Sequence, residues 1–352
     1  MRWKLSTQKK PRASPQAQAS GCAHHHANNA ASVMSSEFDL IARYFTRPTP
    51  GTVLGVGDDC ALLAPTPDMQ LAVSSDMLLE GRHFSPQDSP AGIGHKSLAV
   101  NLSDLAAMGA TPRWATLSIA LPGIDEAWLQ AFARGFFRMA DAHRIELVGG
   151  DTTRGALAIA ITVIGEVPPG QALQRNGAQA GDEVWVSGQL GSAALALAYR
   201  QGRLFMEQID AAKVLPALYL PQPRVALGIA LRGIAHSAID LSDGLLADLG
   251  HILQTSKVGA VLEFARLPVA AVAQNYLADP VARECVLAGG DDYELCFTTA
   301  VDQRDAVLAA GAQAGVTVTR IGHVTAQSGL QVLDAQGEPM TINKTGYDHF
   351  AG

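Results

Sequence analysis

The sequence predicts an α/β protein of the α+β type that folds into two domains. Its 352 residues exceed the usual length of one domain, and 48% of them are hydrophobic, which is enough for two cores. Patterns typical of strands and of helices alternate in both halves of the chain. Pro168-Pro169-Gly170 lies between the halves and is typical of a linker. We therefore expect an N-terminal domain at residues 34–168 and a C-terminal domain at residues 169–352.

Residues 1–33 are predicted to form a disordered extension. They are rich in Ala, Ser, Gln and basic residues, show no apolar period, and lack the hydrophobic core of a secretory signal. The absence of acids in this stretch is also typical of an organellar transit peptide, and a start of translation at Met34 is the other interpretation. The run His24-His25-His26 is expected to be solvated, because no other type of metal ligand accompanies it.

The rest of the chain is acidic. The formal net charge is -7, and residues 1–33 contain five cations and no acid, so the remaining residues carry -12. This charge argues against nucleic acid or an anionic membrane as a partner, and an anionic nucleotide would need metal ions as mediators. The apolar runs are much shorter than the roughly 20 residues of a membrane helix. The four cysteines form no close pair, which fits a reducing cytoplasm rather than a zinc or disulfide framework.

The predicted elements of the N-terminal domain begin with a helix. Ser36 is placed as its cap, and Phe38, Ile41 and Phe45 are spaced for one helix face. Hydrophobic spacing then predicts strands at residues 53–63, 70–74, 114–121 and 156–163, and helices at residues 94–108 and 126–143.

The C-terminal domain is predicted to begin at residues 181–188, where the sequence reads GDEVWVSG. Helices are expected near residues 192–199, 223–231 and 245–254, and strands near residues 260–264 and 295–299.

Short islands of Asp, Ser and Gly recur along the chain. They lie at residues 57–59, 74–76, 101–104, 149–153, 240–244 and 289–294. Leu-Ser-Asp at 102–104 is followed 47 residues later by Gly-Gly-Asp at 149–151, and the pair recurs at 241–243 and 289–291. Clustered carboxylates repel one another, and their strongest partners are hard divalent cations that take oxygen ligands. The order of the islands suggests that acids from both domains face one cleft.

Each island on its own has a simpler interpretation. Gly-Asp-Asp at 57–59 is compatible with a solvated turn. Asp104 and Asp243 could instead stabilise a helix N-terminus, an interaction of about 0.3–1 kcal/mol that needs no metal. A single surface arginine, such as Arg154 or Arg175, is more often solvated than bound to a phosphate tail.

Several catalytic motifs are absent from the sequence. Residues 92–97 resemble a phosphate-binding Walker loop, but His95 interrupts the required Gly-Lys step. The sequence has neither a dinucleotide-binding glycine fingerprint nor a Gly-x-Ser-x-Gly elbow, and no Cys lies in a nucleophile motif. We therefore expect metal-assisted chemistry without a covalent enzyme intermediate.

The islands together resemble the motifs of bacterial thiamine-monophosphate kinases. The resemblance runs from about Glu37 to the end of the chain. It rests on GDDCALL at 57–63, NLSDLAAMGA at 101–110, LVGGDTTRG at 147–155, SAIDLSDGL at 237–245, GDDYEL at 290–295 and GYDHF at 346–350.

This resemblance implies a two-domain PurM-like fold whose N-terminal domain forms a homodimer through its sheet. It also implies a cytoplasmic enzyme that uses ATP and several Mg²⁺ ions to phosphorylate thiamine monophosphate by direct in-line transfer. The implied metal ligands are Asp59, Ser74, Ser75, Asp76, Asp104, Asp151, Asp240 and Asp243. Gly150, Asp151, Arg175 and Ser242 are implied to contact ATP, and His83, Asp291 and Tyr347 to contact the thiamine substrate.

Three positions depart from the family pattern. Ser75 stands where Thr is common, which exchanges one hydroxyl for another. His143 stands where a Tyr that stacks on the nucleotide is common. The contact of that Tyr with adenine is therefore not assigned to this chain. Asp291 stands where Glu is usual, and its carboxylate is one methylene shorter.

Two other functions are compatible with parts of the pattern. A purine-pathway cyclo-ligase of the same ATP-binding superfamily would share the acidic cleft. A non-catalytic Ca²⁺-binding protein would crowd its ligands into one loop of roughly 12 residues. Here the acids are spread over more than 180 residues of chain, from Asp59 to Asp243, which argues against the second function.

Overall fold

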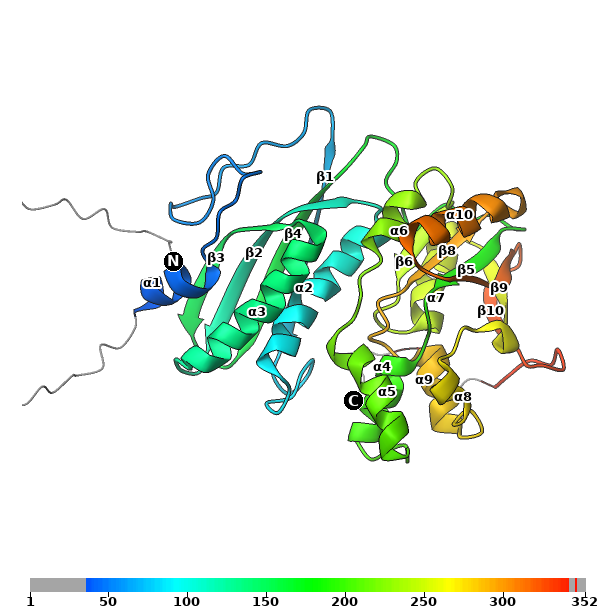
Figure 1. Ribbon diagram of the computed structural model, residues 1–352. Coiled ribbons are helices and arrows are strands. Elements are labelled where there is room, and N and C mark those ends of the chain that lie inside the picture. Colours follow the sequence, from blue (N-terminus) through cyan, green and yellow to red (C-terminus); the bar gives the residue numbers. More distant parts are fainter. Residues whose placement is uncertain (1–35, 342–345, 347–352) are drawn as a thin grey trace, which may run out of the picture.

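The computed structural model describes residues 36–341 and Gly346, and it contains two β-sheets that lie side by side (Figure 1). The first is four-stranded, in the order β1-β4-β2-β3, and the second is six-stranded, in the order β10-β7-β9-β5-β8-β6. We call residues 36–167 the four-stranded unit and residues 183–333 the six-stranded unit. The two-sheet α+β architecture agrees with the predicted fold class.

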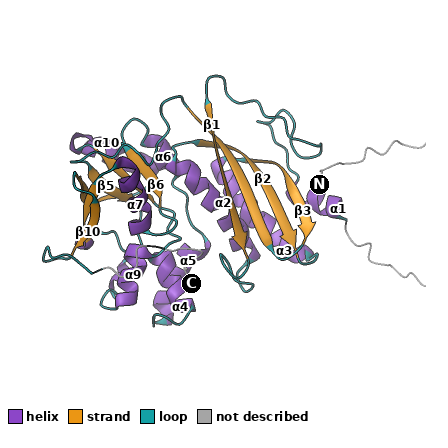
Figure 2. Cartoon of the chain, turned by 180° about the vertical axis from the view of Figure 1, so that it is seen from behind, coloured by secondary structure: helices purple, strands orange, loops and turns teal. Residues whose placement is uncertain are grey.

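The four-stranded sheet is antiparallel except where β2 pairs with β3. Its strands are β1 (Gln70–Leu79), β2 (Thr111–Leu121), β3 (Glu146–Arg154) and β4 (Ala158–Val167). Helices α2 (Pro90–Ala107) and α3 (Glu126–His143) cover one face of this sheet, and the view from behind shows the other face without helices (Figure 2).

Two glycines allow α2 and α3 to pack closely. A Cβ atom on Gly94 would lie 2.1 Å from the Phe132 carbonyl oxygen, and one on Gly135 would lie 1.8 Å from the Ala91 carbonyl oxygen. The backbones of the two helices therefore touch, which fixes α2 relative to the sheet.

The predicted first helix is also confirmed as α1 (Glu37–Leu40), continued by the π-helix η1 (Ile41–Phe45). Ser36 caps it in a capping box with Asp39.

The six-stranded sheet has helices on both faces. Its strands are β5 (Glu183–Ser187), β6 (Ser237–Asp240), β7 (Gly259–Glu263), β8 (Leu295–Thr299), β9 (Val318–Thr325) and β10 (Gly329–Leu333). Along β5, Val184 and Val186 face one core while Trp185 faces the other, as the alternation of a strand requires. The helices are α4 (Ser192–Arg200), α5 (Gln208–Tyr219), α6 (Val225–Ala230), α7 (Leu245–Ser256), α8 (Ala271–Gln274), α9 (Pro280–Ala288) and α10 (Arg304–Ala314), with 3₁₀ turns η2 (Phe264–Arg266) and η3 (Val301–Gln303).

Helix α2 joins the two units. One hydrophobic core contains Leu98 and Leu102 of α2 together with Leu227 of α6 and Leu295 of β8. A Cβ atom on Gly228 would lie 1.9 Å from the Ala106 carbonyl oxygen, so α6 rests directly on the end of α2. The units therefore share buried surface, and a cleft between them has fixed walls.

The structure corrects several sequence predictions. Residues 53–63 do not form a strand, because Leu54 and Leu62 make only an isolated bridge and Val53 is 67% exposed. Strand β1 continues to Leu79, so Ser74-Ser75-Asp76 lies within a strand rather than at its end. Strands β3 and β6 were not predicted, since their Gly- and Asp-containing motifs were interpreted as loops.

Some predictions lie outside these findings. The extension at residues 1–33 and Tyr347 fall outside the described residues. The chain passes from one sheet to the other between Val167 and Glu183, and the exact boundary at residue 168 stays a prediction. No helix of the described part is both long enough and apolar enough to cross a membrane.

Candidate active site

A cavity of about 650 Å³ lies between the two units. Its walls come from β1 and α2 on one side, and from α4, α9 and the loops after β6 and before β8 on the other. Seven predicted site residues line it: Asp76, His83, Asp104, Asp240, Ser242, Asp243 and Asp291. The structure thus brings acids from both units to one cleft, as the recurring islands predicted.

Three carboxylates form the acid cluster, which we define as the buried Asp240 and the half-buried Asp76 and Asp104. Burial and the nearby Asp104 raise the pKa of Asp76 to about 6. The same two causes, in the same order, raise the pKa of Asp240 to about 7. Burial also raises the pKa of Asp104, against the hydrogen bond that the Ser74 hydroxyl donates to it. The shifts come first from burial and, for Asp76 and Asp240, also from the repulsion of neighbouring carboxylates, and a bound cation would offset both.

Hydrogen bonds between β1 and α2 hold the cluster together. The Asp76 amide donates to Asn101 Oδ1 at 3.0 Å, and Asn101 Nδ2 donates to the Ser97 carbonyl oxygen at 3.0 Å. Ser74 and Asp76 share one face of β1, because side chains alternate along a strand. Ser75 faces the other side, where its hydroxyl donates to the Ile161 carbonyl oxygen and accepts from Thr162 Oγ1.

Strand β3 carries Gly150 and Asp151 outside the cavity lining. Gly150 has φ +148°, and a Cβ atom there would lie 1.7 Å from the Leu117 carbonyl oxygen, so only glycine fits beside β2. Asp151 Oδ1 is buried and has no hydrogen-bond partner among the residues that the structure describes. An orphaned buried carboxylate oxygen is costly unless a ligand such as a cation completes it.

The remaining nucleotide and metal candidates lie around the cavity. Arg175 stands close enough to Asp104 to lower its pKa. Asp59 lies on an exposed loop and is not part of the lining. His143 lies at the end of α3 near His95, and neither residue lines the cavity.

In the six-stranded unit, backbone hydrogen bonds join the segment that contains Leu-Ser-Asp at 241–243 to the segment that follows Gly-Gly at 289–290. The Asp291 amide donates to the Ser242 carbonyl oxygen at 2.9 Å, and the Tyr293 amide donates to the Leu241 carbonyl oxygen at 2.8 Å. A Cβ atom on Gly290 would lie 2.3 Å from the Ser242 carbonyl oxygen, which explains the glycine at this position.

Helix capping does not account for Asp104. Asp104 lies in the last turn of α2, at the end where the helix dipole disfavours a carboxylate. At the start of α7, Asp248 accepts from the Asp243 and Gly244 amides, both at 3.0 Å. The interpretation of Asp104 as a residue at a helix N-terminus is therefore wrong, and Asp248 is the acid that binds the first amides of α7.

The loop before β8 holds Asp291 in an unusual backbone conformation. Asp291 and Tyr293 have φ values of +71° and +51°, which L-residues adopt only where surrounding contacts impose them. Asp291 Oδ2 accepts from Lys96 Nζ of α2 at 2.9 Å, and Oδ1 accepts from the Tyr293 hydroxyl at 3.0 Å. Burial and Asp291 raise the pKa of Tyr293 well above its usual value, so this hydroxyl keeps its proton.

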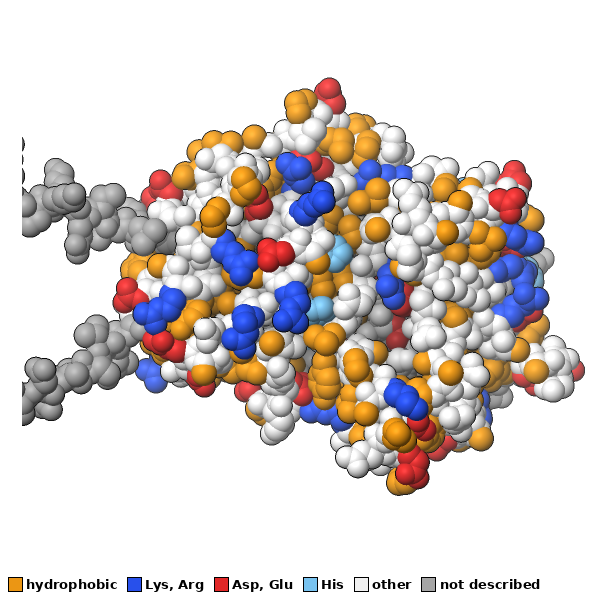
Figure 3. Space-filling view, in the orientation of Figure 1, with side chains coloured by type: hydrophobic (Ala, Val, Ile, Leu, Met, Phe, Trp, Pro, Cys, Tyr) orange, Lys and Arg blue, Asp and Glu red, His pale blue; other side chains and the backbone are white. Residues whose placement is uncertain are grey.

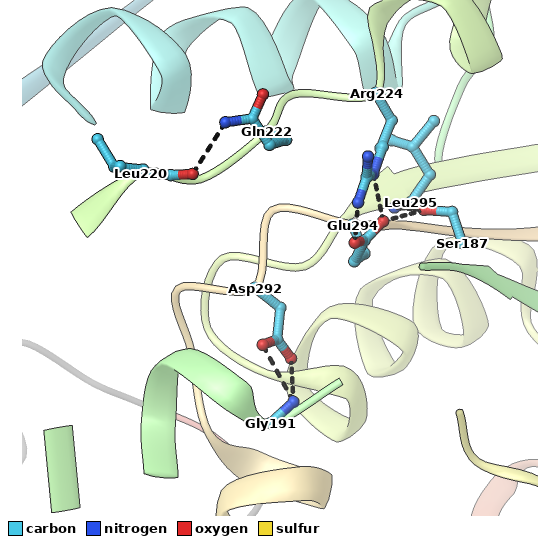
Figure 4. A network of polar contacts seen from close by, with 8 residues as sticks. All are labelled: Ser187, Gly191, Leu220, Gln222, Arg224, Asp292, Glu294 and Leu295. Carbon is cyan, nitrogen blue, oxygen red and sulfur yellow. Dashed lines mark hydrogen bonds and ion pairs between the residues drawn. The ribbon is translucent and has the colours of Figure 1, made fainter. Parts of the chain in front are cut away.

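The neighbouring acids of the loop point elsewhere and bind other partners (Figure 4). Asp292 accepts from the Gly191 amide at the start of α4, at 2.8 and 3.0 Å. Glu294 accepts from Ser187 Oγ at 2.5 Å and from Arg224 Nε at 2.6 Å. Asp292 is therefore bound to α4 and cannot take the place of Asp291 beside Lys96.

Two of the three substrate candidates, His83 and Asp291, line the cavity. His83 lines the cavity, and its Nδ1 accepts from the Leu79 amide at 2.9 Å. Tyr347 lies outside the described residues, but its neighbour Gly346 packs beside Ala247 near the start of α7. Gly346 therefore lies beside the backbone of Asp243, which lines the cavity.

The cavity suits cations that the substrates help to bind. Among residues 36–341 and Gly346, no group of three or more His, Cys, Asp or Glu side chains is arranged to hold an ion by itself. Mg²⁺ is commonly held by one or two carboxylates together with water and substrate phosphates. The repulsion within the acid cluster and the orphaned oxygen of Asp151 fit that mode of binding.

Sequence reasoning missed Lys96 as a cavity residue. It was passed over as part of the segment 92–97, which fails as a Walker loop. Its partner Asp291 is 195 residues away in the chain, so no local pattern could reveal the pair.

Figure 3 shows that Lys and Arg side chains gather over α2 and α3 on the outer face of the four-stranded unit. The cavity walls, by contrast, carry twice as many acids as Lys and Arg residues. An anionic ligand in the cavity would therefore need accompanying cations.

The fold and the acidic cleft place the chain in a class of ATP-binding proteins. Residues 57–167 match the family described as AIR synthase related protein, N-terminal domain, and residues 179–335 match the corresponding C-terminal domain. Together these matches cover most of the chain and define a two-domain PurM-like protein.

Within this class, the chain belongs to the thiamine-monophosphate kinase family. It is 46% identical to the thiamine-monophosphate kinase of Escherichia coli K12 over 319 residues, which cover 90% of this chain and 98% of that protein. It is 48% identical to the crystal structure of the same enzyme from Stenotrophomonas maltophilia, with a TM-score of 0.77 over 86% of this chain and 96% of that one. A structure of AaThiL complexed with AMPPCP and TMP is 27% identical, with a TM-score of 0.70 over 89% and 95% of the two chains.

Proposed function

We propose that this protein transfers the γ-phosphoryl group of ATP to thiamine monophosphate, giving thiamine diphosphate and ADP. The observation that carries the proposal is the cavity between the units, in which the acid cluster faces the Asp291 loop. The family relatives support the same reaction, and the AaThiL complex was obtained with an ATP analogue and TMP.

The acids in and around the cavity are proposed to hold several Mg²⁺ ions. Bound Mg²⁺ would neutralise phosphate oxygens as charge shifts between them. The proposed ligands are Asp59, Ser74, Ser75, Asp76, Asp104, Asp151, Asp240 and Asp243. Ser75 would contact Mg²⁺ through its backbone, because its hydroxyl faces the side of β1 opposite Ser74 and Asp76.

The remaining site candidates are proposed to position the two substrates. Gly150, Arg175 and Ser242 would contact ATP, and His83, Asp291 and Tyr347 would contact thiamine monophosphate. An oxygen of the substrate phosphate would attack the γ-phosphorus, and the bond from that phosphorus to the β,γ-bridging oxygen would break. Positioning and charge neutralisation are sufficient for this reaction, so the transfer is proposed to be direct.

We also propose that the protein is a cytoplasmic homodimer that binds neither nucleic acid nor membranes. One face of the four-stranded sheet carries no helices (Figure 2). Leu71, Val73 and Met77 are exposed on the side of β1 opposite Ser74 and Asp76, which supports the dimer. Exposed apolar side chains grouped on one face are typical of an interface. Residues 34–168 would supply this interface and the metal ligands of β1 and α2, and residues 169–352 would complete the substrate cleft.

The proposed function is tested with purified protein, ATP, Mg²⁺ and thiamine monophosphate. The expected products, separated by chromatography, are ADP and thiamine diphosphate in equal amounts. Turnover of formylglycinamidine ribonucleotide in place of thiamine monophosphate would contradict the proposal and indicate a cyclo-ligase. Tight Ca²⁺ binding in calorimetry without any ATP turnover would indicate a non-catalytic ion-binding protein.

A further inference from the structure

Lys96 forms a buried ion pair across the cavity. It is only 5% exposed, lies on α2 of the four-stranded unit, and donates to Asp291 Oδ2 of the six-stranded unit at 2.9 Å. The Asp291 side chain is 29% exposed, so its carboxylate still reaches the cavity. A buried ammonium is unfavourable unless a partner compensates its charge, and Asp291 is that partner.

The six-stranded unit fixes the rest of the Asp291 loop. Asp292 is bound by the Gly191 amide, and Glu294 by Ser187 and Arg224. Between these anchors the Tyr293 hydroxyl holds Asp291 Oδ1. Lys96 is the partner of Asp291 that comes from the opposite wall, so it determines how the carboxylate is turned toward the other unit.

Helix α2 holds the ammonium in a fixed place. Gly94 locks the helix against the Phe132 backbone, and His95 Nε2 lies 2.8 Å from the Pro221 carbonyl oxygen of the six-stranded unit. The same helix carries Asp104 of the acid cluster, eight residues further on. At about 1.5 Å of rise per residue, Lys96 and Asp104 are separated by roughly 12 Å along one rigid axis.

We propose that Lys96 is a positioning residue for the phosphate-accepting substrate. Its ammonium fixes the Asp291 carboxylate, and α2 thereby sets the spacing between that carboxylate and the acid cluster around Asp104. The role rests on the proposed kinase function and deepens it, because it assigns a determinant of thiamine monophosphate binding to the unit opposite the substrate loop. Both Asp291 oxygens keep a lone pair that can accept a hydrogen bond from an N–H group of the substrate.

The test is a double-mutant cycle of Lys96→Met and Asp291→Asn, with steady-state kinetics for both substrates. Lys96→Met is expected to raise the KM for thiamine monophosphate about tenfold, while the KM for ATP changes by less than about twofold. Lys96→Arg keeps the charge and is expected to restore most of the affinity. In the Asp291→Asn background, Lys96→Met is expected to have no further effect, because the two residues act as one unit.

Arg200→Met is the matched control. Arg200 of α4 pairs with Asp88 of the four-stranded unit at 2.8 Å, so this pair also crosses between the units, but neither residue lines the cavity. Its loss is expected to leave both KM values unchanged. The double variant Lys96→Met/Asp291→Asn has lost both charges of the pair, so it leaves no carboxylate without its partner. Calorimetric titration of this variant with thiamine monophosphate measures the substrate affinity without turnover.

The outcomes separate the two proposals. The positioning role would be overturned if the fold-changes of Lys96→Met and Asp291→Asn in the KM for thiamine monophosphate multiply in the double variant. It would also be overturned if Lys96→Met changes only the KM for ATP. An equal loss in Arg200→Met would show that any bridge between the units has the same effect, which also overturns it. An inactive wild-type protein would contradict the kinase function itself, whereas an active wild type that is insensitive to Lys96→Met contradicts only the role of Lys96.

Discussion

The acid cluster and the Asp291 loop are both rich in carboxylates, but they are compensated in opposite ways. In the loop, each acid has a partner from the protein: Lys96 for Asp291, the Gly191 amide for Asp292, and Arg224 with Ser187 for Glu294. In the cluster, burial and the neighbouring acid Asp104 raise the pKa of Asp76 and Asp240. Each acid of the loop is thus bound by the protein, although burial still raises the pKa of Asp292 well above its usual value. The cluster has fewer such partners and would be stabilised further by a cation or by protons from solution.

The largest expected effect is the loss of turnover in Asp104→Ala. This change removes the acid that is common to the shifts of Asp76 and Asp240, and we expect kcat at ordinary Mg²⁺ concentrations to fall at least about a thousandfold. The melting temperature of the metal-free protein should not fall, because removing one carboxylate relieves repulsion. Kinetics and thermal unfolding measure the two quantities, and a fully active variant would rule out a metal role for Asp104.

The reverse pattern is expected in the loop. Glu294→Ala leaves the buried part of Arg224 without its partner, and breaking a buried ion pair typically costs about 3–5 kcal/mol of unfolding free energy. The control is Glu263→Ala, which removes a partly exposed carboxylate that pairs with Arg266 and Arg320 and should cost about 1 kcal/mol. Equal losses in urea unfolding for the two variants would show that the Glu294 network is not a stabilising element.

Much of this contrast could not be predicted from the sequence. Hydrophobic spacing placed the helices near 94–108 and 126–143. The buried residues of α3 repeat with the helix period, whereas α2 lies between the two units and is buried on nearly every side. The same method missed β3 and β6, because Gly149, Gly150 and Asp240 are typical of loops, and only packing against neighbouring strands makes them extended. Residues 53–63 have the pattern of a strand but no neighbouring strand to complete a ladder.

The site was predictable to the extent that its residues lie in short motifs. Asp76, Asp104, Asp240, Asp243 and Asp291 were identified from such motifs, and the fold brings them to one cavity. Whether each acid is paired was not predictable, since the partners come from other elements. Lys96 reaches Asp291 only because α2 packs beside the six-stranded unit.

The acid cluster should also make the stability of the metal-free protein depend on pH. The pKa of Asp240 in the folded state, about 7, lies above its ordinary value of 3.8, so the folded protein binds more protons than the unfolded chain between these values. This contribution to stability is fully present below pH 4 and is lost as the pH rises toward 7. We expect the melting temperature of the metal-free protein to fall by a few degrees more from pH 5 to pH 7.5 than that of Asp240→Asn. Identical slopes for the two proteins would contradict the shift.

The smallest expected effect is that of Asp291→Glu, which adds one methylene to the carboxylate held by Lys96. A small loop shift or a bridging water can absorb the added length of about 1.5 Å. We expect the KM for thiamine monophosphate to change by less than about threefold, whereas Asp291→Ala should raise it clearly and leave the KM for ATP nearly unchanged. A change in the ATP parameter alone would place Asp291 near the nucleotide.

The most direct test of the difference between the two regions is a Mg²⁺ titration of thiamine monophosphate phosphorylation, with ATP held constant, for the wild type, Asp240→Asn and Glu263→Ala. If cations complete the acid cluster, the half-saturating Mg²⁺ concentration rises at least about tenfold in Asp240→Asn, in line with the usual cost of removing a group that supports a metal. The exposed Glu263 should leave the curve in place. Superimposable curves for the wild type and Asp240→Asn would show that the cluster does not bind the catalytic cations, and would contradict the account.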